Sequence, residues 1–309
     1  MLAACTTEKP MQYEASVTPY RDGKQCAISF TYDDGMLCHY TDIAPELEKR
    51  GFCGTFWIIG ANMGKDDVGY PWMNWDQVAD LAKRGHEIAN HTWNHPSLPA
   101  LSIDSVAQEL VLCDDKIEEV TGKRPISMAY PYNAMSPEVV AKCEEGRVAT
   151  RTFQTGHGQK ESHTTADSMR VWLKGLLKTG EWGVTMTHGT TYGWDMWERP
   201  EELYQFYDEV KAQQDSVWVA PFGEVAAYIK ERDAALVKAE GTNKSLKLTV
   251  CHTLDAALFN QPLSILVKGG DWSKVQAFSK GVGVIDVENR GTELLITVNP
   301  GDEPIELTW

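Results

Sequence analysis

The stretch CAISFTYDDG, residues 26–35, is the part of the chain that decides the fold. It is an apolar strand that ends in two adjacent carboxylates, Asp33 and Asp34, and then Gly35. Neighbouring side chains on a straight strand point to opposite faces, so both carboxylates reach one site only where the chain turns. Gly35 permits such a turn because glycine adopts backbone conformations that are closed to other residues. On its own, Asp-Asp-Gly is also typical of a solvated turn.

A histidine pair, His91 and His95, stands in the segment HTWNH, residues 91–95. Residues four apart approach one another on a helical turn, but Pro96 disfavours a continuing helix, so we expect a short turn after a strand. One carboxylate and two imidazoles hold a divalent ion and leave positions open for water and substrate. The pattern therefore predicts a catalytic metal site, with the second carboxylate free for proton chemistry.

A third apolar stretch, VTMTHG at residues 184–189, also ends in a histidine, His188. In this combination the chain resembles the polysaccharide deacetylases of the NodB-homology type, carbohydrate esterase family 4. The signatures of that family read T-F-D-D-G, H-[ST]-x-x-H, a Pro-aromatic segment and a late L-x-H. The resemblance spans roughly residues 20–232.

The resemblance implies a role for each motif residue. Asp33 would be the general base, His188 the general acid, and the metal would be bound by Asp34, His91 and His95. The chemistry agrees with this division. A metal polarises the acyl carbonyl and its bound water, the base takes the water proton, and the acid delivers a proton to the departing amine or alcohol.

The segment AYPYN, residues 129–133, matches the third signature, and by resemblance the backbone N–H of Tyr132 helps to hold the oxyanion. The chain departs from the family at Ala129, where many members carry an arginine that tethers the catalytic aspartate. Arg151 or Arg170 could supply that arginine from another strand, although a surface or structural role fits each of them as well.

Strand-like and helix-like segments alternate between residues 26 and 233. This alternation predicts a parallel sheet with helical crossovers, and the number of strands suggests a barrel. Each motif lies just past a strand, where the active sites of such barrels assemble. By resemblance, the barrel should be the distorted seven-stranded version of this family. The expected strands are residues 26–32, 54–60, 87–90, 126–130, 148–153, 169–174, 182–187 and 216–220, and the expected helices are 42–50, 75–84, 103–120, 137–145, 200–213 and 224–233.

The C-terminal part has a different texture, with short strand-like runs separated by Gly, Asn and Pro. It predicts a small antiparallel, sandwich-like β domain. The expected division is therefore a lead-in at residues 1–19, a deacetylase barrel at 20–235 and the β-rich domain at 236–309. Within the last, Trp272 or Trp309 could stack on sugar, or could pack in a core.

The chain has 309 residues, 42% of them apolar, which is ample for a buried core. Its net charge of −15 lies mainly in residues 1–235, which carry 22 basic against 35 acidic residues, whereas residues 236–309 carry 7 against 9. An acidic catalytic domain repels nucleic acid and polyanionic sugars. We therefore expect an acetylated, neutral poly- or oligosaccharide as the partner and no nucleic acid.

No apolar run reaches the length of about 18 residues that a transmembrane helix requires. The segment LAAC, residues 2–5, has the form of a bacterial lipobox, and the polar residues 6–10 resemble a tether. The apolar region that should precede a lipobox is missing, so either the start is truncated or the match is accidental. If genuine, the motif predicts a lipid anchor at Cys5, export and a location in the bacterial cell envelope, periplasmic or membrane-anchored.

The remaining cysteines form no Cys-x-x-Cys pair, which excludes zinc-finger and thioredoxin readings, and buried thiols are the default for them. Aromatic residues near the motifs could face sugar or pack inside: the loop 190–197, Trp72, Trp75, Trp93, and Trp172 as a candidate for the family's fourth motif. Histidines without a partner pattern are expected to be surface or structural residues: His39, His86, His157, His163 and His252.

The leading hypothesis is a metal-dependent hydrolase that removes acetyl groups from a carbohydrate. N-acetyl amides and the O-acetyl esters of xylan pass through the same tetrahedral oxyanion, so the motifs do not separate a deacetylase from an acetyl xylan esterase. A second hypothesis is a weakly active or non-catalytic glycan-binding protein that has lost its tethering arginine. The ligand set suits zinc best, and cobalt or nickel also fits.

Overall fold

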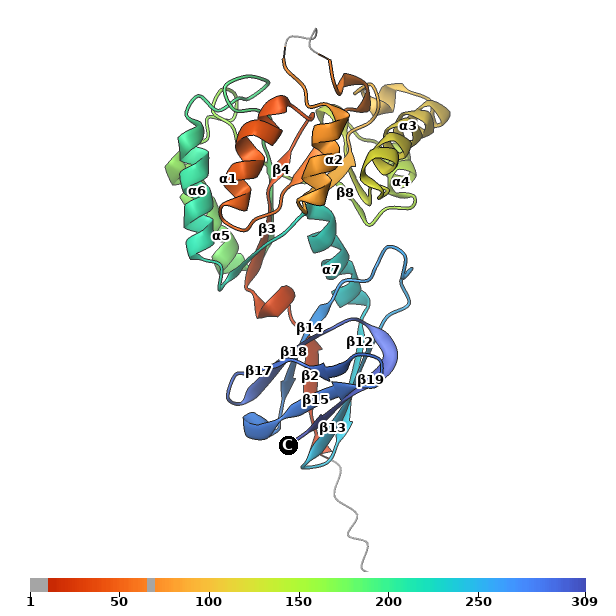
Figure 1. The fold of residues 1–309 in the computed structure, drawn as a ribbon, viewed down its shortest axis with the longest axis vertical. Helices are drawn as coiled ribbons and strands as arrows, with labels where there is room; N and C mark the ends of the chain where they lie inside the picture. Colours follow the sequence, from red (N-terminus) through yellow and green to blue (C-terminus); the bar gives the residue numbers. More distant parts are fainter. Residues whose placement is uncertain (1–10, 66–69) are drawn as a thin grey trace, which may run out of the picture. The chain divides into compact units, whose positions relative to one another are not determined.

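The computed structural model describes residues 11–65 and 70–309. The expected lipid attachment at Cys5 lies outside the described residues. The chain forms two compact units. One comprises residues 25–226, and the other joins the residues up to 24 with residues 227–309. Figure 1 labels many of the elements of both units.

Parallel strands form the centre of the unit at residues 25–226, called here the α/β unit. The opening stretch gives β3 (Cys26–Ser29) and β4 (Thr31–Tyr32), which are buried throughout. The α/β unit has two parallel sheets, and they meet at this stretch. Strand β3 lies between two strands of the first sheet, and β4 is the edge strand of the second. Tyr32 of β4 forms a bridge to Thr187, which follows a strand of the first sheet. The first sheet has the order β11 (Val217–Val219), β3, β10 (Trp182–Met186), β9 (Thr155–Gly156), and the second β4, β5 (Thr55–Ile58), β6 (Glu87–Asn90), β7 (Ser127–Ala129), β8 (Ala149–Arg151). The expected distorted barrel is confirmed.

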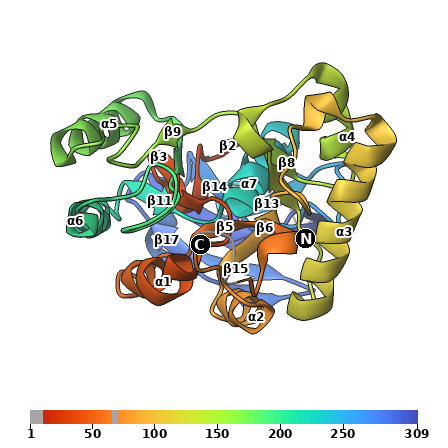
Figure 2. The ribbon, with the colours of Figure 1, turned by 90° about the horizontal axis from the view of Figure 1, so that it is seen from above.

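Helices α1 to α6 surround these strands (Figure 2). The side chain of a serine, threonine or asparagine caps the start of α2 to α5, and left-handed glycines end α3 and α5. These end signals explain why most of the expected helices match the observed ones. The observed helices are α1 (Ala44–Glu48), α2 (Trp75–Lys83), α3 (Ile103–Thr121), α4 (Pro137–Glu144), α5 (Ala166–Thr179) and α6 (Pro200–Ala212).

The prediction of a strand at residues 169–174 is wrong, because these residues lie inside α5. Alternating apolar residues suggested a period of two, but Val171 is 70% exposed and does not belong to a buried strand face. The residues that are buried follow the helical spacing of three and four, and Thr165 and Ser168 form a capping box at the start. The buried residues of α5 are Met169, Leu173 and Leu176.

The other unit, called here the β unit, consists mainly of two antiparallel sheets. Strand β2 (Glu14–Val17), which precedes the α/β unit in sequence, pairs with β14 (Leu263–Lys268), so residues expected to be a lead-in supply an edge strand. Helix α7 (Phe222–Ala234) runs from one unit into the other along the chain. The sheet orders are β1 (Met11–Gln12), β12 (Leu236–Gly241), β13 (Ser245–Cys251), β19 (Gly301–Thr308), β15 (Gln276–Ser279), β16 (Gly283–Ile285), and β17 (Val287–Asn289), β18 (Glu293–Val298), β14, β2.

Side chains that alternate along β13, β14 and β18 fill the core of the β unit. Trp272 is only 1% exposed, and its ring centroid lies 5.0 Å from that of Trp309 and 6.3 Å from that of Tyr13. Trp272 is therefore a core residue and not an exposed platform for sugar. The cysteines of the described residues are all free. No helix in the described part of the chain is both long and apolar enough to cross a membrane.

Substitutions of two glycines, one on α5 and one on the strand that packs against it, test the assignment of residues 169–174 to this helix. Gly175 lies on the exposed side of α5, with no atom within 4 Å of an added Cβ, so Gly175→Ala should raise the free energy of unfolding by about 0.5–1 kcal/mol. Gly183 on β10 faces the side chains of Leu176 and Trp172 at 2.5 Å, so Gly183→Ala should lower it by about 1–3 kcal/mol. Urea denaturation measures both, and a destabilising Gly175→Ala would argue against the helix.

Candidate active site

The chain turns sharply where β4 ends, and this turn positions both carboxylates. The Asp33 N–H still donates to the Thr187 carbonyl at 2.9 Å, but Asp34 and Gly35 have φ of 84° and 85°. At Gly35 this positive φ is a conformation that other residues rarely adopt, and an added Cβ would also lie 2.7 Å from the end of the Met63 side chain, so the turn favours glycine. The result is that Asp33 and Asp34 line the same pocket, as the sequence predicts.

His91 and His95 lie on a loop after β6 and not on a helix. Thr92 and His95 have φ of 68° and 57°, and the His95 N–H donates to Thr92 Oγ1 at 3.0 Å. The two imidazole centroids are 4.8 Å apart. The expected short turn after a strand is confirmed, and left-handed residues bring the rings together in place of a helical turn.

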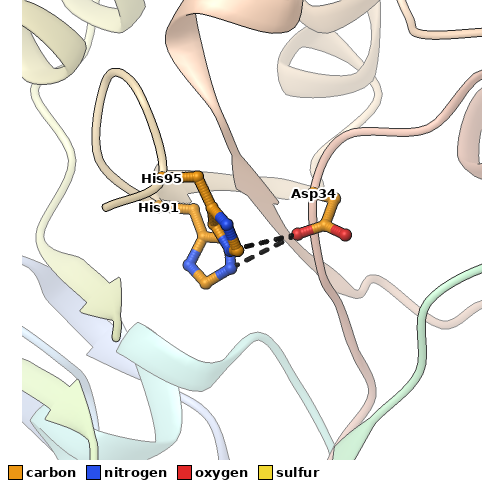
Figure 3. A group of neighbouring side chains, drawn as sticks. All are labelled: Asp34, His91 and His95. Carbon is orange, nitrogen blue, oxygen red and sulfur yellow. Dashed lines mark ion pairs between the residues drawn. The ribbon is translucent and has the colours of Figure 1, made fainter. Parts of the chain in front are cut away.

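Asp34, His91 and His95 form a group that could hold a metal ion (Figure 3). Asp34 Oδ1 lies 3.5 Å from His91 Nε2 and 3.7 Å from His95 Nε2, and the three ligand atoms lie within 4.8 Å of one another. Asp34 Oδ1 is buried and has no hydrogen-bond partner among the described residues. His91 Nδ1 donates to the Ala129 carbonyl at 2.8 Å, so a neutral His91 turns the lone pair of Nε2 toward the carboxylate. Lone pairs that face one another suit a cation between them.

The protonation states suit a metal site as well. Burial would raise the pKa of Asp34, but His91, His188 and His95 around it hold that pKa well below its usual range. Burial, and then the neighbouring His91, lower the pKa of His95 to about 4. At neutral pH the group therefore offers an ionised carboxylate and a neutral imidazole, the forms that bind metals.

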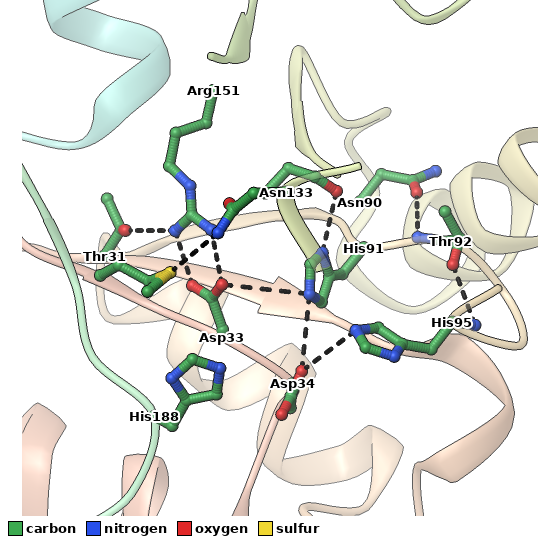
Figure 4. A network of polar contacts seen from close by, with 12 residues as sticks. Thr31, Asp33, Asp34, Asn90, His91, Thr92, His95, Asn133, Arg151 and His188 are labelled. Atoms are coloured by element: carbon green, nitrogen blue, oxygen red, sulfur yellow. Dashed lines mark hydrogen bonds and ion pairs between the residues drawn. The ribbon is translucent and has the colours of Figure 1, made fainter. Parts of the chain in front are cut away.

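Arg151, at the end of β8, holds the other carboxylate (Figure 4). Its two terminal nitrogens donate to Asp33 Oδ1 at 2.6 Å and to Asp33 Oδ2 at 2.5 Å, and one of them also donates to Thr31 Oγ1 at 2.9 Å. Both side chains are buried. Burial would raise the pKa of Asp33, but the Arg151 guanidinium overcomes this effect and holds the pKa below its usual value. Arg170 lies on α5, part-exposed, and pairs with Asp167 and Glu209 instead.

His188 follows β10 and completes the pocket. Its ring meets that of Trp194 edge-on with centroids 4.7 Å apart, and across the metal group the ring of Tyr132 lies 4.6 Å from that of His95. Trp194 is 49% exposed and Tyr132 is 69% exposed, so both stand at the mouth. The cavity measures about 540 Å³ and is lined by Asp33, Asp34, His91, His95, Tyr130, Tyr132, Asn133, Met186, His188 and Trp194.

His39 is a site residue that the sequence reasoning missed. It lies on a π-helical turn, η2 (His39–Ile43), is fully buried, and its Nε2 is 2.6 Å from the carbonyl oxygen of His188. Burial lowers the pKa of His39 to about 4, so the neutral ring donates this hydrogen bond. No sequence pattern marks this contact, because it joins segments about 150 residues apart through a backbone atom.

The other expected aromatic and histidine residues divide between core and pocket. In the loop 190–197, Trp197 is buried and donates to the His157 carbonyl, whereas Trp194 faces the pocket. Trp172 packs against the ring of His157 and does not line the pocket. His86 pairs with Glu48, which is a structural role. Aromatic residues packed in the interior and an aromatic residue that lines the pocket thus both occur, at different positions.

Several known proteins resemble part of this chain. Residues 20–150 match the family model described as polysaccharide deacetylase. The peptidoglycan-N-acetylmuramic acid deacetylase PdaC of Bacillus subtilis is 30% identical over 119 residues, which is 38% of this chain and 24% of that protein. A chitin deacetylase of a Pestalotiopsis species is 26% identical over 137 residues, 43% of this chain and 44% of that protein. The match thus spans less than half the length of these curated relatives.

A solved structure gives the same result for the fold. The structure of a peptidoglycan N-acetylglucosamine deacetylase covers 68% of this chain and 91% of its own, with a TM-score of 0.51 and 18% identity. Residues 20–150 thus resemble the polysaccharide deacetylases in sequence, and the chain shares its fold with a solved structure of such an enzyme. The resemblance seen in the motifs is confirmed.

Removing the Arg151 guanidinium tests its role as the counter-charge of Asp33. Arg151→Met should lower the free energy of unfolding at pH 7 by about 3–5 kcal/mol, because it leaves a buried carboxylate unpaired. The pKa of Asp33 is depressed in the folded protein, so the stability that its ionisation contributes is present above the unfolded value of about 4 and is lost at lower pH. The difference between variant and parent should therefore shrink as the pH falls below about 4.

Urea denaturation at pH 7 and in acid measures this effect. Arg170→Met is the matched control, and since its ion pairs are part-exposed it should cost at most about 1 kcal/mol. Equal, small effects of the two substitutions would show that Arg151 is not the counter-charge.

Proposed function

We propose that this chain is a metal-dependent carbohydrate deacetylase that hydrolyses N-acetyl amides or O-acetyl esters on a poly- or oligosaccharide. One observation carries the proposal. A possible metal-binding group, a second carboxylate with its own buried arginine, and a histidine converge on one cavity at the ends of parallel strands. The match to the family model at residues 20–150 supports it, as do the relatives named above, which are described as deacetylases of peptidoglycan and chitin.

Asp34, His91 and His95 would hold the metal. A divalent ion bound by one carboxylate and two imidazoles polarises an acyl carbonyl and lowers the pKa of water. We propose zinc, and cobalt or nickel fits the same donors. His91 is well prepared for this role because its Nδ1 is already fixed by the Ala129 carbonyl.

Asp33 would act as the base. Its depressed pKa keeps it ionised at neutral pH, so it can accept a proton from the attacking water. The two nitrogens of Arg151 fix the plane of its carboxylate, and each oxygen keeps a lone pair for this proton. Arg151, at the end of β8, would thereby fill the role of the tethering arginine that many family members carry at the position of Ala129.

His188 would be the acid that protonates the departing nitrogen or oxygen. The hydrogen bond from His39 to its carbonyl fixes the backbone that carries the ring. Tyr132 has a left-handed backbone with φ of 57°, at the edge of the cavity. We propose that its N–H helps to hold the developing oxyanion.

A neutral sugar fits this pocket better than an anionic one. The exposed rings of Tyr132 and Trp194 stand at its mouth, where aromatic faces stack on pyranose rings. Among the described residues that line the cavity there is no lysine or arginine, and the chain carries a net charge of −15. Amide and ester substrates remain alternatives because both form the same oxyanion.

Acetate release from N-acetylated and O-acetylated oligosaccharides tests the reaction. Release should stop after chelation and return with added zinc or cobalt, and Asp33→Asn should lower kcat by about 10²–10⁴-fold because the base is lost. If Asp33→Asn kept full turnover, the assigned base would be wrong, and if chelation had no effect, the metal mechanism would fail. Binding of the oligosaccharides without any release by the parent would favour the glycan-binding alternative.

The charge of the substrate gives a separate prediction. Oligomers of N-acetylglucosamine should react with a higher kcat/KM than acetylated oligomers of equal length that carry a carboxylate on each second sugar. Repulsion by the acidic domain causes the difference, so it should narrow between about 10 mM and 1 M salt, as screening shortens the range of charge interactions. A preference for the anionic oligomers at low salt would contradict this view of the substrate.

We also propose a location in the bacterial cell envelope, with a lipid on Cys5 as the anchor. The lipobox-like residues 2–5 and the polar residues 6–10 support it. Labelled fatty acid should then be incorporated into the parent but not into Cys5→Ala when each is expressed with an export signal, and equal labelling of the two would overturn the anchor.

A further inference from the structure

We propose that Asn90 is a positioning residue for the metal ligands and that the buried ion pair Asp114–Arg147 behind it supports this role. It holds the loop at residues 91–95 in the shape that brings His91 and His95 together. This inference rests on the proposed function, since the two histidines are proposed there as ligands.

The loop needs such support because its backbone is strained. Thr92 and His95 both have positive φ, 68° and 57°, and a β-branched residue such as threonine rarely adopts this conformation. Strained residues persist only where the surrounding structure fixes them. The hydrogen bond from the His95 N–H to Thr92 Oγ1 links the two strained positions, so holding Thr92 also holds His95.

Asn90 holds Thr92 directly, as Figure 4 shows. Its side-chain oxygen accepts the Thr92 N–H at 2.6 Å, and its Nδ2 donates to the Leu110 carbonyl at 3.0 Å and to Asp114 Oδ1 at 2.7 Å. Both partners of Nδ2 are acceptors, so the amide has one orientation that satisfies all three contacts. Asn90 is fully buried, and no water-facing alternative competes for these bonds.

The charge behind Asn90 fixes that orientation. Asp114 is 4% exposed on the inner side of α3, and its Oδ2 accepts from Arg147 at 2.5 Å. Arg147, 8% exposed, also donates to the Pro125 carbonyl at 3.1 Å. One oxygen of Asp114 pairs with Arg147, and the other requires a hydrogen-bond donor, which Asn90 supplies. Because the ion pair is buried, water does not replace this donor. The contacts thus run from Arg147 through Asp114, Asn90 and Thr92 to His95.

The same helix holds the same loop a second time, but at the surface. Glu109 accepts the N–H and the side-chain amide of Asn94, both at 2.7 Å. Asn94 is exposed and has no hydrogen bond to Thr92 or His95 among the described contacts. Glu109→Gln is therefore a matched control, since it alters one residue of α3 that contacts the loop without touching the strained positions.

Asn90→Asp is the sharpest test, because it keeps the shape and the acceptor for Thr92 but turns an oxygen toward Asp114 and the Leu110 carbonyl. Co²⁺ affinity by calorimetry and the visible absorption of the Co²⁺-loaded full chain are measured for each variant. We expect the Kd for Co²⁺ to rise about 10–100-fold with an altered spectrum. Glu109→Gln should keep the parent's Kd and spectrum, and Asn90→Asp/Asp114→Asn should recover much of the loss, because it restores a donor opposite the carboxylate.

Amide hydrogen exchange without metal gives an independent readout. The amides of residues 92 and 95 should exchange faster in Asn90→Asp than in the parent or in Glu109→Gln. If Asn90→Asp does not fold, Asn90→Ala, which removes the amide donor and the acceptor for the Thr92 N–H without adding charge, takes its place in both measurements.

The outcomes separate this inference from the proposed function. If the parent binds Co²⁺ and the Asn90 variant binds it with the same Kd, spectrum and exchange rates, the positioning role is overturned and the metal site stands. If the parent itself binds no Co²⁺, the proposed metal site fails and the inference falls with it.

Discussion

The buried contact between Arg151 and Asp33 is the interaction on which the rest of the site depends. It spans the barrel from the end of β8 to the end of β4, and both of its side chains lie away from water. Two adjacent carboxylates, one buried and one partly buried, would otherwise repel each other, and one would take up a proton. With its own arginine, Asp33 stays ionised beside Asp34 at neutral pH.

Two identical neighbours in sequence thereby acquire different chemistry. Asp33 faces a permanent cation held by the fold, whereas Asp34 faces the imidazoles of His91 and His95 and has a buried oxygen without a hydrogen bond among the described residues. The environment, and not the residue type, sets the two apart. The turn at Asp34 and Gly35 makes this possible because it points both side chains at one cavity while their partners come from different strands.

Much of this could be predicted from the sequence, and the limits have physical causes. The motifs and the alternation of strands and helices predict the barrel and the residues around the cavity, because both depend on local patterns. The role of Arg151 could not be decided, since a cross-barrel partner leaves no trace in spacing. His39 and Asn90 carry no signal for the same reason. The prediction of a strand at residues 169–174 failed because three alternating apolar residues fit a strand and a helix equally well until the burial of each is known.

The pairing of β2 with β14 bears on the order in which the chain acquires its structure during synthesis. Residues 14–17 leave the ribosome early, but their partner at residues 263–268 follows about 250 residues later. At about 5–20 residues per second this delay is on the order of tens of seconds. All residues of the α/β unit, 25–226, are synthesised before β14, so the strands of this unit can pair with one another during that time. We therefore expect the α/β unit to fold first, while β2, a short and partly polar strand, stays unpaired until β14 has been synthesised.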